Sequence, residues 1–146
     1  MDKRIGSTWW TLKIALGAAV FLAGLDKFFN LLTNWTDYLN PVALQLVPVS
    51  SEIFMQCVGI IEMIVGIAIL TRWTTLGAYL AACWQVAIAV NLVSMERFYD
   101  VAVRDLLLAV AAFTLARLTA VRRAEVASSD ATRWESSPRG ILSLKL

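Results

Sequence analysis

The sequence predicts an all-α membrane protein, a four-transmembrane-helix bundle with both termini on the cytoplasmic side. Composition is the first indication: 59% of the 146 residues are apolar and 16% are charged, where soluble proteins have about 45–50% and about 25%. The second is four apolar segments, each near the roughly 20 residues that cross about 30 Å of hydrocarbon as a helix. The third is an uneven distribution of Lys and Arg between the two ends of these segments.

The four segments are expected to be helices because lipid offers no hydrogen-bond partner to the backbone, which must pair within its own segment. They form a predicted transmembrane domain over residues 1–121. The expected helices are 10–32, 53–71, 74–94 and 101–121. The first follows a basic start, but it is too long for the core of a signal peptide, so we expect a retained helix.

Two segments lie outside these helices. The loop 33–52 contains an apolar stretch from Asn40 to Pro48 that is too short to cross, so we expect a short interfacial segment at the outer surface. Residues 122–146 are polar and Ser-rich and are expected to form a cytoplasmic tail. Its candidates for docking to a partner subunit are Trp134, Ile141 and Leu142.

The orientation rests on the excess of Lys and Arg in cytoplasmic segments. With the N-terminus inside, three of these residues lie toward the outside: Lys27, Arg97 and Arg104. The other ten lie on the inner side: Lys3, Arg4, Lys13, Arg72, Arg117, Arg122, Arg123, Arg133, Arg139 and Lys145. The membrane is therefore crossed with the N-terminus and C-terminus inside.

The residue inventory excludes several classes of site. There is no His and the net charge is only +2, which argues against haem or zinc bound through His and against nucleic acid as a partner. Cys57 and Cys83 form no C-x-x-C motif and are expected as buried free thiols. No metal site and no catalytic residue is predicted. A quinone or a lipid remains open as a ligand.

Glu62 is the deepest charged residue. It lies about nine residues from either end of the second segment, or roughly 13 Å deep. A charge near the bilayer centre costs on the order of 3 kcal/mol and is usually functional or paired. Gly59 and Gly66 share its face and predict close approach of another helix. Gln85, with Trp84, is expected at mid-depth opposite Glu62.

A second charged group lies nearer the outside. Asp26 and Lys27 on the first segment and Arg104 and Asp105 on the fourth come out at one depth, so Lys27–Asp105 and Asp26–Arg104 are expected pairs. Asp105 also heads a stripe of small residues that predicts a packing seam. The stripe is Asp105, Ala109, Ala112 and Ala116.

Two interpretations of these polar residues stay open. In the structural one, Asp26, Lys27, Glu62, Gln85 and the Arg104–Asp105 pair fix helix register. In the functional one, they line a pocket that opens outward to a small ligand, a quinone head group or protons.

Three runs resemble the DoxX-like family of small bacterial integral membrane proteins. They are LGAAVFLAGLDKFF from Leu16, VGIIEMIVG from Val58 and YDVAVRDL from Tyr99. The resemblance implies a four-helix bundle in a bacterial cytoplasmic (inner) membrane, with recurrent polar positions at Lys27, Glu62, Arg104 and Asp105. The family takes its name from a small subunit of a thiosulfate:quinone oxidoreductase, and other members are linked to membrane-bound redox assemblies.

The leading hypothesis is a non-catalytic accessory subunit of a larger membrane complex linked to electron transfer or quinone. Its partners are then the lipid bilayer and other membrane protein subunits, and the chain is not an enzyme on its own. The alternative is a quinone-linked oxidoreductase subunit with a polar pocket among helices 1, 2 and 4. A small transporter or proton-conducting protein ranks third, since the inverted-repeat signature is missing.

Overall fold

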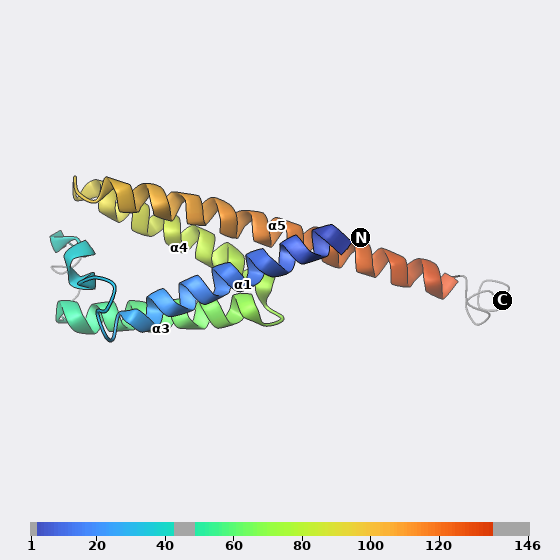
Figure 1. The fold of residues 1–146 in the computed structure, drawn as a ribbon, viewed down its shortest axis with the longest axis horizontal. Coiled ribbons are helices and arrows are strands. Elements are labelled where there is room, and N and C mark those ends of the chain that lie inside the picture. The colour runs from blue at the N-terminus through green and yellow to red at the C-terminus, as the bar shows by residue number, and fades with distance from the viewer. Residues whose placement is uncertain (1–2, 43–48, 136–146) are drawn as a thin grey trace.

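A computed structural model describes residues 3–42 and 49–135, and within these ranges the chain is helical with no strand (Figure 1). Four long α-helices and one 3-10 helix, η1, account for most of it. Their bounds are α1 Lys3–Asp26, η1 Trp35–Tyr38, α3 Ser51–Leu70, α4 Thr74–Ser94 and α5 Tyr99–Glu135. The predicted all-α class is confirmed.

Three of these helices are long and apolar enough to cross a membrane: Gly6–Asp26 of α1, all of α3 and all of α4. Large apolar side chains face outward from the bundle, among them Ile64 at 61% and Leu107 at 66% exposure. Such a surface suits lipid rather than water. The apolar stretch of α5 is interrupted by three charged residues, Arg104, Asp105 and Arg117.

The helices pack as two antiparallel pairs, α1 with α3 and α4 with α5. In Figure 1 the two pairs come together at one end and spread apart toward the other, where η1 lies. Contacts between the pairs run chiefly from α3 to α4 and from α1 to α5. A cavity lies between the two pairs, and η1 borders it.

Glycines form the seam between α1 and α3. A Cβ atom built on Gly24 would lie 2.6 Å from the carbonyl oxygen of Gly59, and one on Gly66 would lie 2.9 Å from the carbonyl oxygen of Gly17. Only residues without a side chain allow backbones to approach so closely. The packing role predicted for Gly59 and Gly66 is confirmed.

The predicted seam on α5 is confirmed as well. Asp105, Ala109, Ala112 and Ala116 are all buried, at 2%, 6%, 2% and 0% exposure. Small residues of α4 join the α5 seam in one core cluster, among them Ala78, Ala81 and Ala82. Small side chains on both helices let α4 and α5 lie close along much of their length.

The first helix differs from its predicted range of 10–32. It begins at Lys3 and ends at Asp26, although Phe28, Phe29, Leu31 and Leu32 continue the apolar run. The Asp26 carboxylate accepts the backbone N–H groups of Leu31 and Leu32 at 3.0–3.3 Å, and Asn30 has a φ of 51°. These two features turn the chain out of the helix.

The last helix also exceeds its prediction, 101–121, and continues to Glu135 through the first part of the expected tail 122–146. Residues Arg122–Glu135 include many good helix formers, and extending an existing helix needs no new nucleus. At 37 residues α5 is about 55 Å long, and Figure 1 shows its end projecting beyond the other helices. The second and third helices match their predictions within two residues.

Two smaller predictions can also be compared. Cys57 and Cys83 are free thiols, but both are exposed on the bundle surface rather than buried. The expected interfacial segment from Asn40 to Pro48 lies mostly outside the described residues.

Candidate functional site

A cavity of about 410 Å³ occupies the space between the two helix pairs. All four long helices and the segment from Leu32 to Leu39 contribute to its wall. Most of the lining is apolar. The side chains with polar or charged groups that border it are Lys27, Trp35, Tyr38, Glu62, Trp84, Gln85, Asn91, Arg104 and Asp105.

A buried ion pair forms one side of the cavity. Lys27 Nζ lies 2.5 Å from Glu62 Oε2, and the two side chains are only 4% and 7% exposed. Trp84 Nε1 donates a hydrogen bond to the other carboxylate oxygen, Oε1, at 3.3 Å. Lys27 Nζ also donates to the Ala23 carbonyl oxygen at 3.4 Å and lies 3.8 Å from the centroid of a Trp35 ring. Both buried charges are thus compensated, as a low-dielectric site requires.

The glycine seam positions this pair. Gly59 lies one turn before Glu62 on α3, and a Cβ on Gly59 would be 3.2 Å from the Lys27 Cβ. The missing side chain lets the end of α1 approach α3 at this level. As a result the Lys27 ammonium reaches the Glu62 carboxylate.

The structure corrects both pairings predicted for the outer charges. Lys27 pairs with Glu62 rather than Asp105, because α1 packs on α3 far more closely than on α5. Arg104 pairs with its neighbour Asp105, with 2.9 Å between Nη2 and Oδ1, rather than with Asp26. The Arg104 side chain is 57% exposed and that of Asp105 is 3% exposed.

Asp26 organises the loop that follows α1 and does not border the cavity. Besides the Leu31 and Leu32 N–H groups, its carboxylate accepts a 2.8 Å hydrogen bond from Trp35 Nε1. This bond fixes the indole ring of Trp35 over Lys27. The expected site residue Asp26 therefore acts on the cavity through Trp35.

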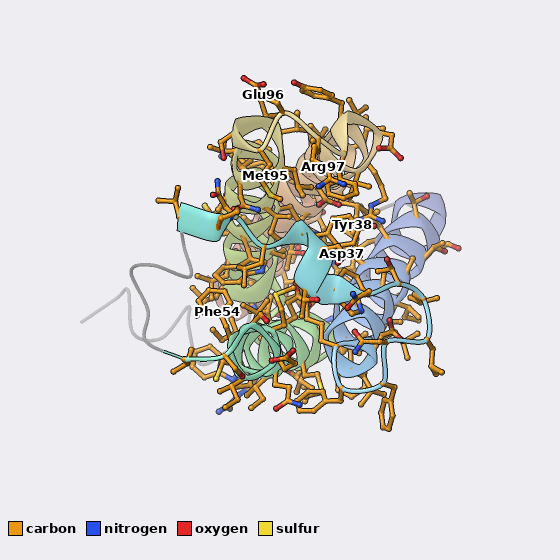
Figure 2. The ribbon with its side chains drawn as sticks, turned by 90° about the vertical axis from the view of Figure 1, so that its left-hand side faces the viewer. Asp37, Tyr38, Phe54, Met95, Glu96 and Arg97 are labelled. Carbon is orange, nitrogen blue, oxygen red and sulfur yellow. The ribbon has the colours of Figure 1, made fainter. Side chains whose placement is uncertain are left out.

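The 3-10 helix η1 closes the wide end of the bundle. Figure 2, viewed toward this end, shows η1 lying between the ends of the two helix pairs. Trp35 attaches it to α1, as above. Tyr38 attaches it to the other pair: its carbonyl oxygen accepts a 2.9 Å hydrogen bond from Asn91 Nδ2, and its ring centroid lies 4.6 Å from that of Phe98.

Five of the six polar site candidates border this cavity: Lys27, Glu62, Gln85, Arg104 and Asp105. Trp35 and Tyr38, which also border the cavity, were not among the site residues predicted from the sequence. Their position in the loop that follows the charged end of the first helix could have indicated a place beside the cavity. Trp134 lies in the last turn of α5, while Ile141 and Leu142 lie outside the described residues.

The lining of this cavity offers groups suited to binding a small ligand. An apolar wall accommodates a hydrophobic body, while an ammonium, an indole N–H and the Gln85 and Asn91 amides offer hydrogen bonds to a polar head. Within residues 3–42 and 49–135, no three His, Cys, Asp or Glu residues come together as a metal site would need. Comparisons with protein-family models, curated proteins and solved structures each give no match for this chain.

Proposed function

We propose that this chain is a multi-pass membrane protein whose cavity between the helix pairs binds a small apolar molecule with a hydrogen-bonding head group, of which a quinone is the leading class. The observation that carries the proposal is the cavity itself, which combines an apolar wall with a compensated buried ion pair. Ligand sites in proteins are typically apolar hollows with a few convergent polar groups.

The ion pair supports binding more than a purely structural role. Lys27 and Glu62 border the cavity instead of being sealed between helices. A quinone carbonyl oxygen would accept a hydrogen bond from the Lys27 ammonium or from an amide N–H. The ring and its apolar tail would then lie along side chains such as Val58, Ile61 and Ile88.

Charge distribution supports a topology with both termini on the cytoplasmic side and the cavity toward the outer surface. At the end opposite η1 the described residues gather Lys13, Arg72, Arg122 and Arg123 around one pocket, in accord with the positive-inside rule. A crossing by α5 is part of this proposal. The Arg104–Asp105 pair lowers the cost of its two charges in lipid.

The DoxX-like resemblance supports the quinone class, a bacterial cytoplasmic membrane and a place beside a larger electron-transfer complex. It rests on short apolar runs and on the polar positions Lys27, Glu62, Arg104 and Asp105. The binding site is proposed from the cavity, and the ligand class follows the resemblance.

The proposal is tested by titrating the purified protein with short-chain ubiquinone and menaquinone analogues while tryptophan fluorescence is recorded. Trp35 and Trp84 both border the cavity, so a bound quinone should quench them saturably. Ala19→Phe places a ring into the cavity and should weaken binding at least tenfold.

Ala15→Phe is the matched control. Ala15 and Ala19 are both exposed and lie one turn apart on α1, but only Ala19 borders the cavity. The control should bind as the unaltered protein does. Equal loss in both variants, or no saturable quenching with either quinone, would contradict the proposal.

A further inference from the structure

The bundle has a second, separate pocket at the end opposite η1. It measures about 320 Å³ and lies among the N-terminal half of α1, the α3–α4 turn and the middle of α5. Four of its nine lining residues carry a positive charge: Lys13, Arg72, Arg122 and Arg123. No carboxylate is among the lining residues.

These cations are held by uncharged groups. Lys13 Nζ donates to the Thr71 carbonyl oxygen at 2.9 Å, and Arg123 Nη2 donates to the Arg72 carbonyl oxygen at 2.5 Å. The Arg122 guanidinium lies 4.2 Å from the centroid of a Trp9 ring. Across the described part of the chain, the salt bridges join other residues. Among the described residues, the pocket therefore gathers four positive charges with no carboxylate in its lining.

One donor in this pocket is also unsatisfied. Nη1 of Arg122 is buried and has no hydrogen-bond partner among the described residues. A buried guanidinium N–H left unpaired is costly. Lys13 is a second buried cation of this pocket, since the residue is only 6% exposed. An anion with several acceptor oxygens would satisfy Arg122 and offset the repulsion among the cations.

The location indicates where that anion comes from. Trp10 and Trp73 are exposed near this end of the bundle, at 50% and 54%, and tryptophan is enriched at the level of lipid head groups. The first turn of α4, which begins at Thr74, borders the pocket and adds the positive end of its helix dipole. Basic pockets between transmembrane helices on the cytoplasmic side suit phospholipid head groups.

We infer that this inner cationic pocket binds a phosphate group, and that an anionic phospholipid head group supplies it. The site is distinct from the quinone-class cavity and does not depend on it. Arg122 would donate to the phosphate oxygens while stacked on Trp9. Arg72 and Arg123, both exposed, would contact the same group from the rim.

The test uses the full chain in a neutral detergent. Phosphatidylglycerol, phosphatidylcholine with the same acyl chains, and inorganic phosphate are added separately at equal concentration and matched ionic strength, and the shift in Tm is recorded. We expect phosphatidylglycerol to raise Tm by several degrees and the other two to have little effect. Lipid phosphorus that stays with the protein through repeated detergent washing is measured as an independent readout.

The double substitution Arg72→Gln/Arg123→Gln should remove most of the phosphatidylglycerol shift and of the retained lipid phosphorus. Both residues are exposed, so the fold should survive. The matched control, Arg97→Gln, removes an exposed cation from the opposite end and should leave both readouts unchanged.

Three results would overturn the inference. Equal shifts with the two phospholipids would show that the head-group charge is not recognised. An equal shift with inorganic phosphate would make the source a free anion rather than a lipid. An unchanged phosphatidylglycerol shift in the double variant would place lipid binding elsewhere.

Discussion

Removing Lys27 should be the most damaging single change to the cavity between the helix pairs. In Lys27→Met the Glu62 carboxylate, on a side chain that is 7% exposed, keeps only Trp84 Nε1 as a hydrogen-bond donor among the described residues. Stranding one member of a buried ion pair typically costs about 3–5 kcal/mol. The ammonium's contact with the Trp35 ring is lost at the same time.

The reverse change should be milder. In Glu62→Gln the Lys27 ammonium faces an amide oxygen that can still accept a hydrogen bond, and it keeps the Ala23 carbonyl and the Trp35 ring. A loss of about 1–3 kcal/mol is expected for the weakened charged hydrogen bond. The double variant Lys27→Met/Glu62→Gln should lose less stability than the sum of the two single changes, by about 1–3 kcal/mol.

The measurement is the free energy of unfolding from titration with dodecyl sulfate in mixed micelles, followed by circular dichroism. A parallel cycle with Lys27→Met and Asp105→Asn is the control, because both residues border the same cavity but do not pair. Its coupling energy should be clearly smaller. A larger coupling between Lys27 and Asp105 than between Lys27 and Glu62 would refute the observed pairing.

Three further predictions concern the seam, the loop and the topology. Gly24→Ala should lower the free energy of unfolding by about 1–3 kcal/mol, since its Cβ would lie 2.6 Å from a backbone oxygen. Gly17→Ala should lower it less, because its Cβ would meet the movable Leu70 side chain. Equal losses in the two variants would argue against the backbone contact. Asp26→Asn should speed hydrogen exchange of the loop amides, measured by mass spectrometry. An amide side chain offers one acceptor oxygen, whereas the carboxylate offers two. Unchanged exchange would contradict the role of Asp26 in holding the loop. In a background without native cysteines, Asp37→Cys should react with an impermeant thiol reagent in intact cells and Ser128→Cys should not; the opposite pattern would invert the proposed topology.

Local sequence determined most of the helical framework. The ranges of α3 and α4 could be predicted within two residues because apolar run length alone decides where a chain prefers lipid. The glycine seam at Gly59 and Gly66 and the small-residue stripe at Ala109, Ala112 and Ala116 were predictable for a similar reason. Residues spaced by three or four share a helix face, whatever that face contacts.

Helix ends were less predictable. The apolar run continues through Phe28 and Phe29, yet α1 ends at Asp26 because that carboxylate binds backbone N–H groups five and six residues ahead. Nothing in hydropathy encodes such a cap. The far end of α5 shows the converse, since its polar residues extend the helix to Glu135, beyond the predicted apolar segment.

Charge pairing was decided by the tertiary structure alone. Asp26 and Asp105 were expected at the depth of Lys27 and Glu62 nearer the bilayer centre, so depth by itself pointed to the wrong partner. The choice depends on which helices are neighbours and how each is rotated. Close packing of α1 on α3 at Gly59 selects Glu62, while Asp26 is occupied by its own loop.

The two pockets depend on the same long-range information. Sequence alone treats Lys13, Arg72, Arg122 and Arg123 as four separate markers of the inner side, because they lie on two helices and a turn. Only folding brings them around one space. Likewise, the cavity between the helix pairs exists because the two tightly packed pairs spread apart. The angle between the pairs arises from contacts between segments far apart in the chain.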